Sequence, residues 1–403
     1  MPDQLETRLR AERDRLDIDQ PPLSVIAARA AELRRRRLAA RAGVAALAAL
    51  AVGGGALASL RGGDPPPPTV AASDPSGTWS TEGITVVGLP HPPRDLPGLV
   101  REAEFLDAER GFLLTADCCT AWLSVTTDGG ATWHTTPSPV AGLPTLVAGG
   151  DAVTLLGTAP DYPRASTADG EHWTSSALPP APPAGLTGLT GASRLVPLGA
   201  GACGDATGAL AGSELATLRQ QPPITACWWS PVRAGDGSWW IGGRDANGHP
   251  AVAVSRDDGS HWSVSAFTGF PGTAYARAAT LGRSVYVTVV SPPTESAAGP
   301  DHLLGVAEST DGGATFGPVH PTAGQATIGG DLVPLLDGRL LIVDGYGHWL
   351  VSEDVGVSWH RLEGLHATMR LARTEGGYVA YGMATIYTAF SVDGSTWQKL
   401  DAQ

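Results

Sequence analysis

A stretch of eight residues that recurs along the chain places the strongest constraint on its fold. Residues 309–316 read Ser-Thr-Asp-Gly-Gly-Ala-Thr-Phe, with aspartate third, glycine fifth and an aromatic residue last. An aspartate side chain accepts hydrogen bonds from the backbone just ahead of it, and glycine tolerates a positive φ. The stretch is therefore typical of a tight turn that opens into a strand, and we call it the aspartate turn.

The sequence contains six aspartate turns. Three further copies have the same length, at 126–133, 255–262 and 352–359, and two are one residue shorter, at 167–173 and 391–397. Their aspartates and closing aromatic residues are Asp128 and Trp133, Asp169 and Trp173, Asp257 and Trp262, Asp311 and Phe316, Asp354 and Trp359, and Asp393 and Trp397. We interpret these residues as structural, because closing a turn accounts for all of them.

The spacing of the closing aromatic residues predicts the architecture. Successive intervals are 40, 89, 54, 43 and 38 residues, and the four-stranded blades of β-propellers recur about every 40–50 residues. The interval of 89 residues then holds two blades, one of which, near 185–220, lacks the turn. We expect an all-β, seven-bladed β-propeller over residues 78–403, with six or eight blades as alternatives. A strand at 83–89 is expected to close the ring by joining blade 7.

The repeated turn resembles the Asp-box, or BNR repeat, of sialidase-like β-propellers. The resemblance covers residues 78–403 and specifies the fold rather than a ligand. It implies that the aspartate turns join third and fourth strands on the face away from a binding site. The loops at the other face supply the candidate ligand-binding residues. These are Tyr162, Arg164, Arg244, Asp245, Asp301, His302, Tyr346, His348 and Tyr381.

Catalysis is the rival interpretation. Enzymes of the sialidase family use three arginines, a Tyr–Glu nucleophile pair and an aspartic acid, and they carry a Phe- or Tyr-Arg-Ile-Pro motif. That motif is missing here, as are Gly-x-Ser-x-Gly, phosphate-loop and His-Glu-x-x-His motifs. Our first hypothesis is therefore a non-catalytic binding module for an envelope glycan or a protein. A sialidase-type glycosidase is the alternative, and it predicts three arginines converging on the central axis beside a Tyr–Glu pair.

We expect no metal and no cofactor. A calcium loop of the EF-hand type needs further oxygen ligands and a closing glutamate, which the aspartate turns do not provide. The adjacent Cys118 and Cys119 have poor spacing for a zinc site.

The net charge of the chain argues against one class of partner. Residues 42–403 carry 17 basic and 33 acidic side chains, a net charge of −16, which argues against nucleic acid as a partner.

The N-terminal 77 residues predict membrane anchoring. Residues 1–41 form a polar, helix-compatible segment with ten arginines and a net charge of +3, and 42–60 are 19 residues without a charge. Such a length spans a bilayer core, and the arginines before it favour a cytoplasmic N-terminus. Residues 61–77 form a proline-rich linker. The layout resembles membrane-anchored actinobacterial proteins. A cleaved signal peptide is the alternative to an anchor, and a regulator-binding role for 1–41 is a third functional hypothesis.

The four cysteines are consistent with an extracytoplasmic propeller at the plasma membrane. Cysteines outside the cytoplasm generally form disulfides. We expect Cys203 to pair with Cys227, because they lie in neighbouring blades, which leaves Cys118 with Cys119. The alternative crosses the two pairs.

Overall fold

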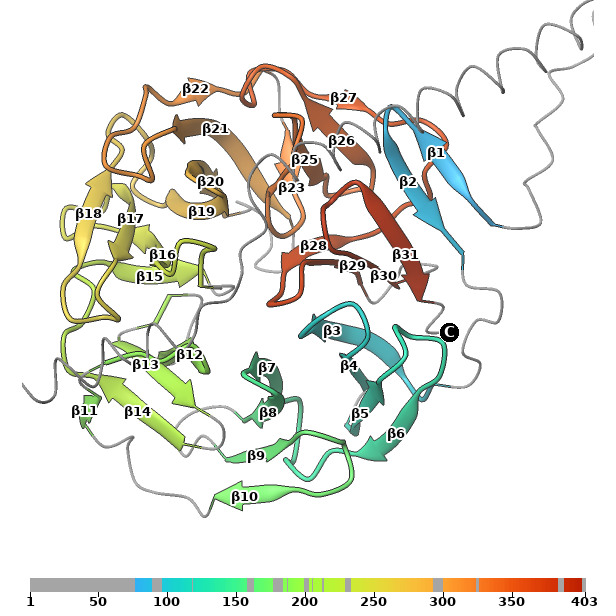
Figure 1. Cartoon of the computed structure of the whole chain (residues 1–403). Coiled ribbons are helices and arrows are strands. Elements are labelled where there is room, and N and C mark those ends of the chain that lie inside the picture. Colours follow the sequence, from blue (N-terminus) through green and yellow to red (C-terminus); the bar gives the residue numbers. More distant parts are fainter. Residues whose placement is uncertain are drawn as a thin grey trace, which may run out of the picture. The chain divides into compact units, whose positions relative to one another are not determined.

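The computed structural model describes residues 77–88, 96–117, 119–157, 163–176, 184–186, 188–198, 203–204, 206–211, 214–228, 233–292, 300–323, 326–382 and 388–400. The chain divides into two compact units, Met1–Ala72 and Ser73–Gln403. The second unit is a ring of seven β-sheets arranged around a central axis (Figure 1). We call the region along this axis, between the inner strands, the central channel. The predicted all-β, seven-bladed fold is thus confirmed. None of the described residues belongs to an apolar helix long enough to cross a bilayer, and the predicted segment 42–60 lies outside them.

Five blades consist of four consecutive strands, ordered from the channel outward. Blades 1 and 2 are β3 (Leu99–Phe105), β4 (Gly111–Ala116), β5 (Ala121–Thr126) and β6 (His134–Pro137), then β7 (Thr145–Gly149), β8 (Ala152–Leu156), β9 (Arg164–Thr167) and β10 (Thr174–Ser176). Blades 4 and 5 are β15 (Thr225–Trp228), β16 (Trp239–Arg244), β17 (Pro250–Ser255) and β18 (Ser263–Ala266), then β19 (Tyr275–Leu281), β20 (Ser284–Ser291), β21 (Asp301–Ser309) and β22 (His320–Pro321), with β23 (Thr327–Ile328) also on β21. Blade 6 is β24 (Val333–Pro334), β25 (Leu340–Val343), β26 (Trp349–Ser352) and β27 (His360–Arg361).

Blade 3 has a different connectivity, which explains its missing aspartate turn. Its sheet order from the channel outward is β12 (Ser193–Leu198), β13 (Ala206–Ala211), β14 (Glu214–Leu218) and β11 (Ala184–Leu186). The outer strand β11 precedes the inner strand in the chain and pairs in parallel with β14. A tight turn cannot join two parallel neighbours. The aspartate turn, which links antiparallel third and fourth strands, has therefore no place in this blade.

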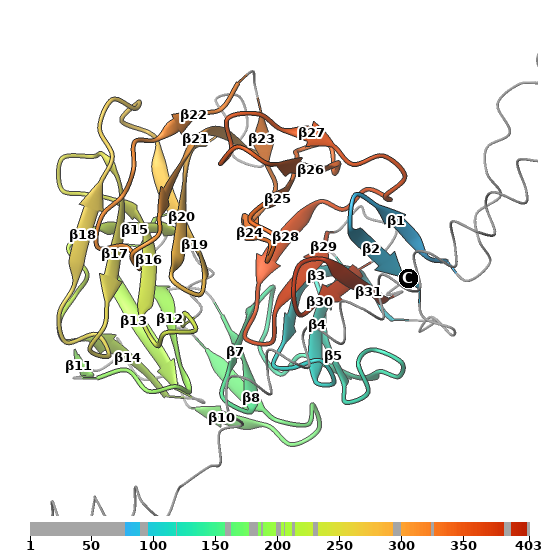
Figure 2. The same ribbon diagram turned by 45° about the horizontal axis from the view of Figure 1, so that its top comes forward.

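The ring closes at blade 7, as predicted, but by an added strand. The blade already has four strands from the C-terminal end of the chain, β28 (Arg370–Arg373), β29 (Tyr378–Tyr381), β30 (Thr388–Ser391) and β31 (Thr396–Leu400). The strand expected at 83–89 is β2 (Ile84–Val87), which pairs in parallel with β31, and β1 (Trp79–Thr81) lies outside it (Figure 2). Ile84 and Val86 are buried against blade 7. The segment thus covers the outer edge of blade 7 instead of completing the blade.

The core lies between the blades, so both faces of each sheet are apolar. Trp239 and Trp240, adjacent on β16, are both buried. Neighbouring strand residues point to opposite faces of a sheet. Both rings are nevertheless buried, because each face of the sheet packs on another blade. The closing aromatic residues join the same core: Trp397 stacks edge-on against Trp349, with ring centroids 5.1 Å apart.

One predicted disulfide is present. Cys203 is bonded to Cys227, which links blade 3 to blade 4. Cys119 is exposed, and Cys118 lies outside the described residues. The second pair therefore stays a prediction.

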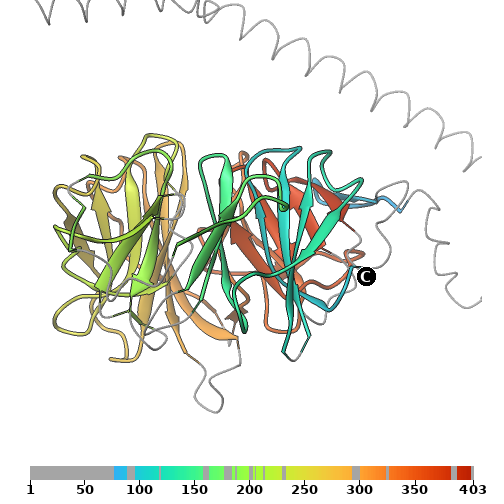
Figure 3. The same cartoon turned by 90° about the horizontal axis from the view of Figure 1, so that it is seen from below.

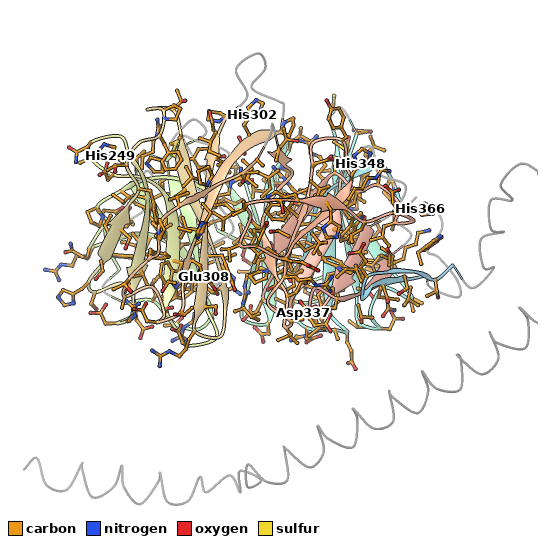
Figure 4. All side chains as sticks on the ribbon, turned by 90° about the horizontal axis from the view of Figure 1, so that it is seen from above. His249, His302, Glu308, Asp337, His348 and His366 are labelled. Carbon is orange, nitrogen blue, oxygen red and sulfur yellow. A yellow bond between two sulfur atoms is a disulfide. The ribbon has the colours of Figure 1, made fainter. Side chains whose placement is uncertain are left out.

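The turns gather at the two faces of the ring (Figure 3). Because successive strands of a blade are antiparallel, an aspartate turn lies at the same end as the turn between the first and second strands. We call this end the aspartate-turn face, and the other end the opposite face. In Figure 4, His249, His302 and His348 lie along the opposite face, whereas Asp337 lies toward the aspartate-turn face.

Candidate functional site

The aspartates of the repeated turn are occupied by the turn itself. In the copy at 309–316, the Ser309 hydroxyl donates to Asp311 Oδ1 (2.7 Å), and the Thr315 N–H and hydroxyl donate to its two oxygens (3.0 and 2.7 Å). The Gly313 N–H donates in turn to the Ser309 hydroxyl (2.8 Å). The backbone bond from Thr315, followed by the hydroxyl bonds, holds the pKa of Asp311 well below its usual range. Both oxygens of the Asp311 carboxylate are thus engaged in closing the turn.

Two candidates on the opposite face also have structural partners. Asp245 accepts hydrogen bonds from the backbone of Asn247 (2.9 Å) and His249 (2.8 Å), and it faces the His249 ring. Asp344 makes the same contacts with His348, whose Nδ1 lies 3.0 Å from the carboxylate. Asp245 and His348 therefore belong to equivalent turns in blades 4 and 6. Tyr346, in the second of these turns, is 80% exposed.

The other candidates are dispersed over the molecule. Arg164 is buried at the start of β9, and Tyr162 lies outside the described residues. Arg244 donates to the Gly272 carbonyl (3.2 Å) and contacts Cys203 Sγ (3.3 Å). His302 pairs with Thr327 in the β21–β23 ladder. The predicted ligand face is thus not one assembled site, but two of its members, Asp301 and Tyr381, lie in a larger cluster.

That cluster lies along the central channel. Inner strands, which come from distant parts of the chain, bring charged side chains together there. They are Glu102 and Glu104 on β3, Arg194 on β12, Arg277 on β19, Asp331 just before β24, and Arg370 and Arg373 on β28. Burial raises the pKa of Glu102 to about 7 and that of Glu104 to about 8.

Asp301 belongs to this cluster through Arg277. The buried Arg277 guanidinium pairs with Asp301 and donates to the Tyr275 hydroxyl (2.8 Å) and the Gly330 carbonyl. The Tyr275 hydroxyl donates to the same Asp301 carboxylate (2.8 Å). One arginine therefore joins the inner strand of blade 5 to β21 and to the chain that enters blade 6.

Asp331 is surrounded by three arginines, Arg277, Arg370 and Arg373. It accepts a hydrogen bond from the Arg373 N–H (2.9 Å), and its own N–H donates to the Leu371 carbonyl (2.8 Å). Burial raises the pKa of Asp331 to about 6, against the lowering by the Arg373 bond and the three guanidinium groups. The charges of three nearby arginines thus act on a buried carboxylate of the chain itself.

Tyr381 lies beside Arg370 and near Glu102 in the same channel. Burial raises its pKa to about 12, although Arg370 acts in the other direction. Glu102 accepts a hydrogen bond from the Leu146 N–H (2.6 Å). A nucleophilic tyrosine needs a lowered pKa or an adjacent free base. The Tyr381–Glu102 pair provides the residue types of the sialidase alternative, but in an environment that disfavours the phenolate.

A pocket of about 400 Å³ lies at the aspartate-turn face of the channel. It is lined by Gly191, Arg194, Arg233, Ala234, Gly235, Gly237, Arg373 and Glu375. Glu375 is in the β28–β29 turn and Arg233 in the β15–β16 connection, which both lie on this face. Sequence reasoning did not find these residues, because it placed the binding site on the opposite face. They share no motif, and only the closed ring brings them together.

No protein-family model and no curated protein matches the sequence. Comparison with solved structures finds other propellers. YCF48 from Cyanidioschyzon merolae is 16% identical, with 72% of this chain and 95% of that chain covered and a TM-score of 0.45. Kluyveromyces lactis Hsv2 is 10% identical (75% and 97% covered, TM-score 0.45), as is Trypanosoma rangeli sialidase (80% and 57% covered, TM-score 0.37). At these identities and TM-scores the likeness carries no functional argument.

Proposed function

We propose that this chain is a membrane-anchored, extracytoplasmic propeller that binds a partner protein and catalyses no reaction. The observation that carries the proposal is the position of Asp331 among Arg277, Arg370 and Arg373. In the sialidase alternative, three arginines clamp the carboxylate of a substrate. Here the chain's own groups already engage two of the three: Arg277 pairs with Asp301, and Arg373 donates to the Thr280 carbonyl and the Tyr378 hydroxyl. The raised pKa of Tyr381 also opposes nucleophilic attack.

A protein partner is favoured over a glycan by the pocket at the aspartate-turn face. Among the described residues, its lining contains arginines, a glutamate, an alanine and three glycines, and no aromatic side chain. Aromatic faces are the usual platform for apolar and stacking contacts with a ligand. Exposed glycine backbone, by contrast, allows another chain to approach closely. Anchoring and extracytoplasmic location are supported by the uncharged segment 42–60 and by the Cys203–Cys227 disulfide.

Two measurements test this function. The first is turnover of a fluorogenic sialoside by the full-length protein, for which we expect no rate above the buffer blank. Turnover that is lost in Tyr381→Phe would establish the sialidase alternative instead.

The second measurement is photo-crosslinking in the native cells, with a photoreactive residue at position 235. Gly235 is exposed, and a Cβ there would meet no atom within 4 Å. Ala246, exposed in the β16–β17 turn of the same blade, is the matched position on the opposite face. We expect a discrete protein adduct from position 235 and none from position 246. Absence of a protein adduct from position 235 would contradict the proposal.

A further inference from the structure

We propose that the pocket at the aspartate-turn face binds a side-chain carboxylate on an extended segment of the partner, with Arg233 as its principal contact. This inference rests on the proposed binding function and names the chemistry that the partner must present. It assigns a role to a pocket that lies on the face opposite to the one predicted from the sequence.

The first argument is charge. The lining holds three arginines, Arg194, Arg233 and Arg373, and one carboxylate, Glu375. The rest of the chain outside residues 1–41 has a large acidic excess. A local positive site on an acidic surface attracts anions that the remaining surface repels. The pocket is therefore selective for a negatively charged group.

The second argument is the placement of Arg233. Its Nε donates to the Gly237 carbonyl (2.9 Å), and its guanidinium lies over the Trp239 ring, 6.0 Å from the centroid. The side chain is still 38% exposed, and its contact with Asp258 is long, at 3.4 Å. The guanidinium is thus held in position while it remains partly exposed, which is the condition for binding a ligand with little loss of entropy.

The glycines of the pocket make room for this arginine. A Cβ at Gly237, which has a φ of +86°, would lie 3.3 Å from Arg233 Nη2, and one at Gly191 would lie 3.5 Å from Nη1. Gly235 faces open space. Two glycines therefore flank the guanidinium, and the third leaves the entrance free for a peptide backbone.

The other two arginines form the wall of the pocket. Arg194 is largely buried and is paired with Glu375. Arg373 donates from Nη1 to the Thr280 carbonyl (3.1 Å) and the Tyr378 hydroxyl (3.2 Å). Its Nε is buried without a hydrogen-bond partner in the described part of the chain. These contacts hold the wall in place, with Arg194 compensated by Glu375, and they leave Arg233 as the more exposed arginine of the lining.

The chemistry favours a carboxylate over a phosphate or an acidic sugar. The planar fork of a guanidinium matches both oxygens of a carboxylate. Glu375 in the lining and Asp258 beside Arg233 repel a doubly charged phosphate more strongly than a single negative charge. The part of the lining that the structure describes offers no ring on which a sugar would stack. An aspartate or glutamate side chain on an extended peptide meets all three conditions.

Fluorescence anisotropy on the full-length protein tests the inference. The probe is a labelled peptide of alternating glutamate and glycine, compared with its glutamine analogue, a glucuronate oligosaccharide and inorganic phosphate. We expect the glutamate peptide to bind and the glutamine peptide to bind at least about tenfold more weakly, as for loss of one charge-assisted contact. Preference for the oligosaccharide or for phosphate, or equal binding of the two peptides, would overturn the inference.

Variants locate the site. Arg233→Gln should weaken binding of the glutamate peptide by about tenfold, whereas Arg283→Gln, an exposed arginine of the β19–β20 turn, should not. Gly235→Asp places a negative charge at the open entrance and should also weaken binding, with Gly235→Asn as its neutral control. Equal affinities for Gly235→Asp and Gly235→Asn would place the peptide elsewhere and overturn the inference.

Failure of this inference is distinguishable from failure of the proposed function. If position 235 crosslinks a protein in cells but the glutamate peptide does not bind, the binding function stands and the carboxylate chemistry is wrong. If neither occurs, both proposals are wrong.

Discussion

Arg194 on the inner strand of blade 3 forms an ion pair with Glu375 in the first turn of blade 7. The two residues are 181 positions apart in the chain, and blades 1 and 2 lie between them on the shorter way around the ring. The pair therefore crosses the channel at the aspartate-turn face. It links two blades that share no interface, and it places a carboxylate inside an otherwise cationic pocket.

Replacement of Glu375 by glutamine should separate these two roles. The largely buried Arg194 loses its partner, but Glu375 is one-third exposed, so we expect the free energy of unfolding to fall by only about 1–2 kcal/mol. Removal of the negative charge should strengthen binding of the glutamate peptide. Urea unfolding and anisotropy measure the two effects, with Glu109→Gln in the exposed β3–β4 turn as control. Weaker peptide binding in Glu375→Gln would contradict the assigned charge balance.

The carboxyls of the channel predict that stability falls as the pH rises above about 5. Burial raises the pKa values of Asp331 to about 6, Glu102 to about 7 and Glu104 to about 8. The folded protein therefore binds protons that the unfolded chain has already released, and the free energy of unfolding decreases from about pH 5 to pH 8. Urea unfolding at unit steps of pH measures this slope.

The variant Glu104→Gln tests whether the raised pKa of Glu104 contributes to this pH dependence of stability. Glutamine resembles the protonated glutamate, so the variant should match the wild type at pH 5 and exceed its stability at pH 8. Below about pH 4 the free energy of unfolding should instead decrease as the pH falls. Aspartates such as Asp311 have a lowered pKa and stabilise the fold only when they are ionised. A wild-type stability that increases between pH 5 and pH 8 would show that these carboxyls are ionised in the folded protein.

Two adjacent glycines of one aspartate turn provide a matched pair. Gly312 and Gly313 both have a positive φ, of 79° and 80°. A Cβ at Gly312 meets no atom within 4 Å, whereas one at Gly313 would lie 2.2 Å from the Trp240 ring. Gly312→Ala should therefore lose only the roughly 1–2 kcal/mol of left-handed backbone strain. Gly313→Ala should lose clearly more, because the buried ring must move. Equal losses by urea unfolding would show that the turn does not pack on Trp240.

The local contacts within each aspartate turn explain which parts of the fold were predictable from the sequence. Each aspartate turn is local: its aspartate, hydroxyl, glycine and aromatic residue lie within eight positions, so six turns reveal six blades. The blade without an aspartate turn was predicted from the interval of 89 residues between two closing aromatic residues, Trp173 and Trp262. Its cause, the parallel pairing of β11 with β14, was not, because a strand that precedes its neighbours at the sheet edge leaves no local pattern.

The channel and its pocket were not predictable in the same way. Asp301 and Tyr381 were among the candidates because they follow or precede loops of the expected face. Arg194, Arg277 and Glu375, by contrast, come from three separate blades and share no spacing. Their charges meet only because inner strands converge on one axis, so their relation is a property of the closed ring and not of any segment.

Ring closure itself gives the last prediction. Ile84 on β2 is fully buried in a cluster with residues of blades 6 and 7, including Trp397 and Leu335. Ile84→Ala should lower the free energy of unfolding by about 2–4 kcal/mol, the usual loss for a large side chain truncated in a core. Val87→Ala, at a half-buried position of the same strand, should lose less than half as much. If Ile84→Ala unfolds at the same urea concentration as the wild type, β2 does not contribute to closing the ring, and blade 7 is stable with the four strands of its own.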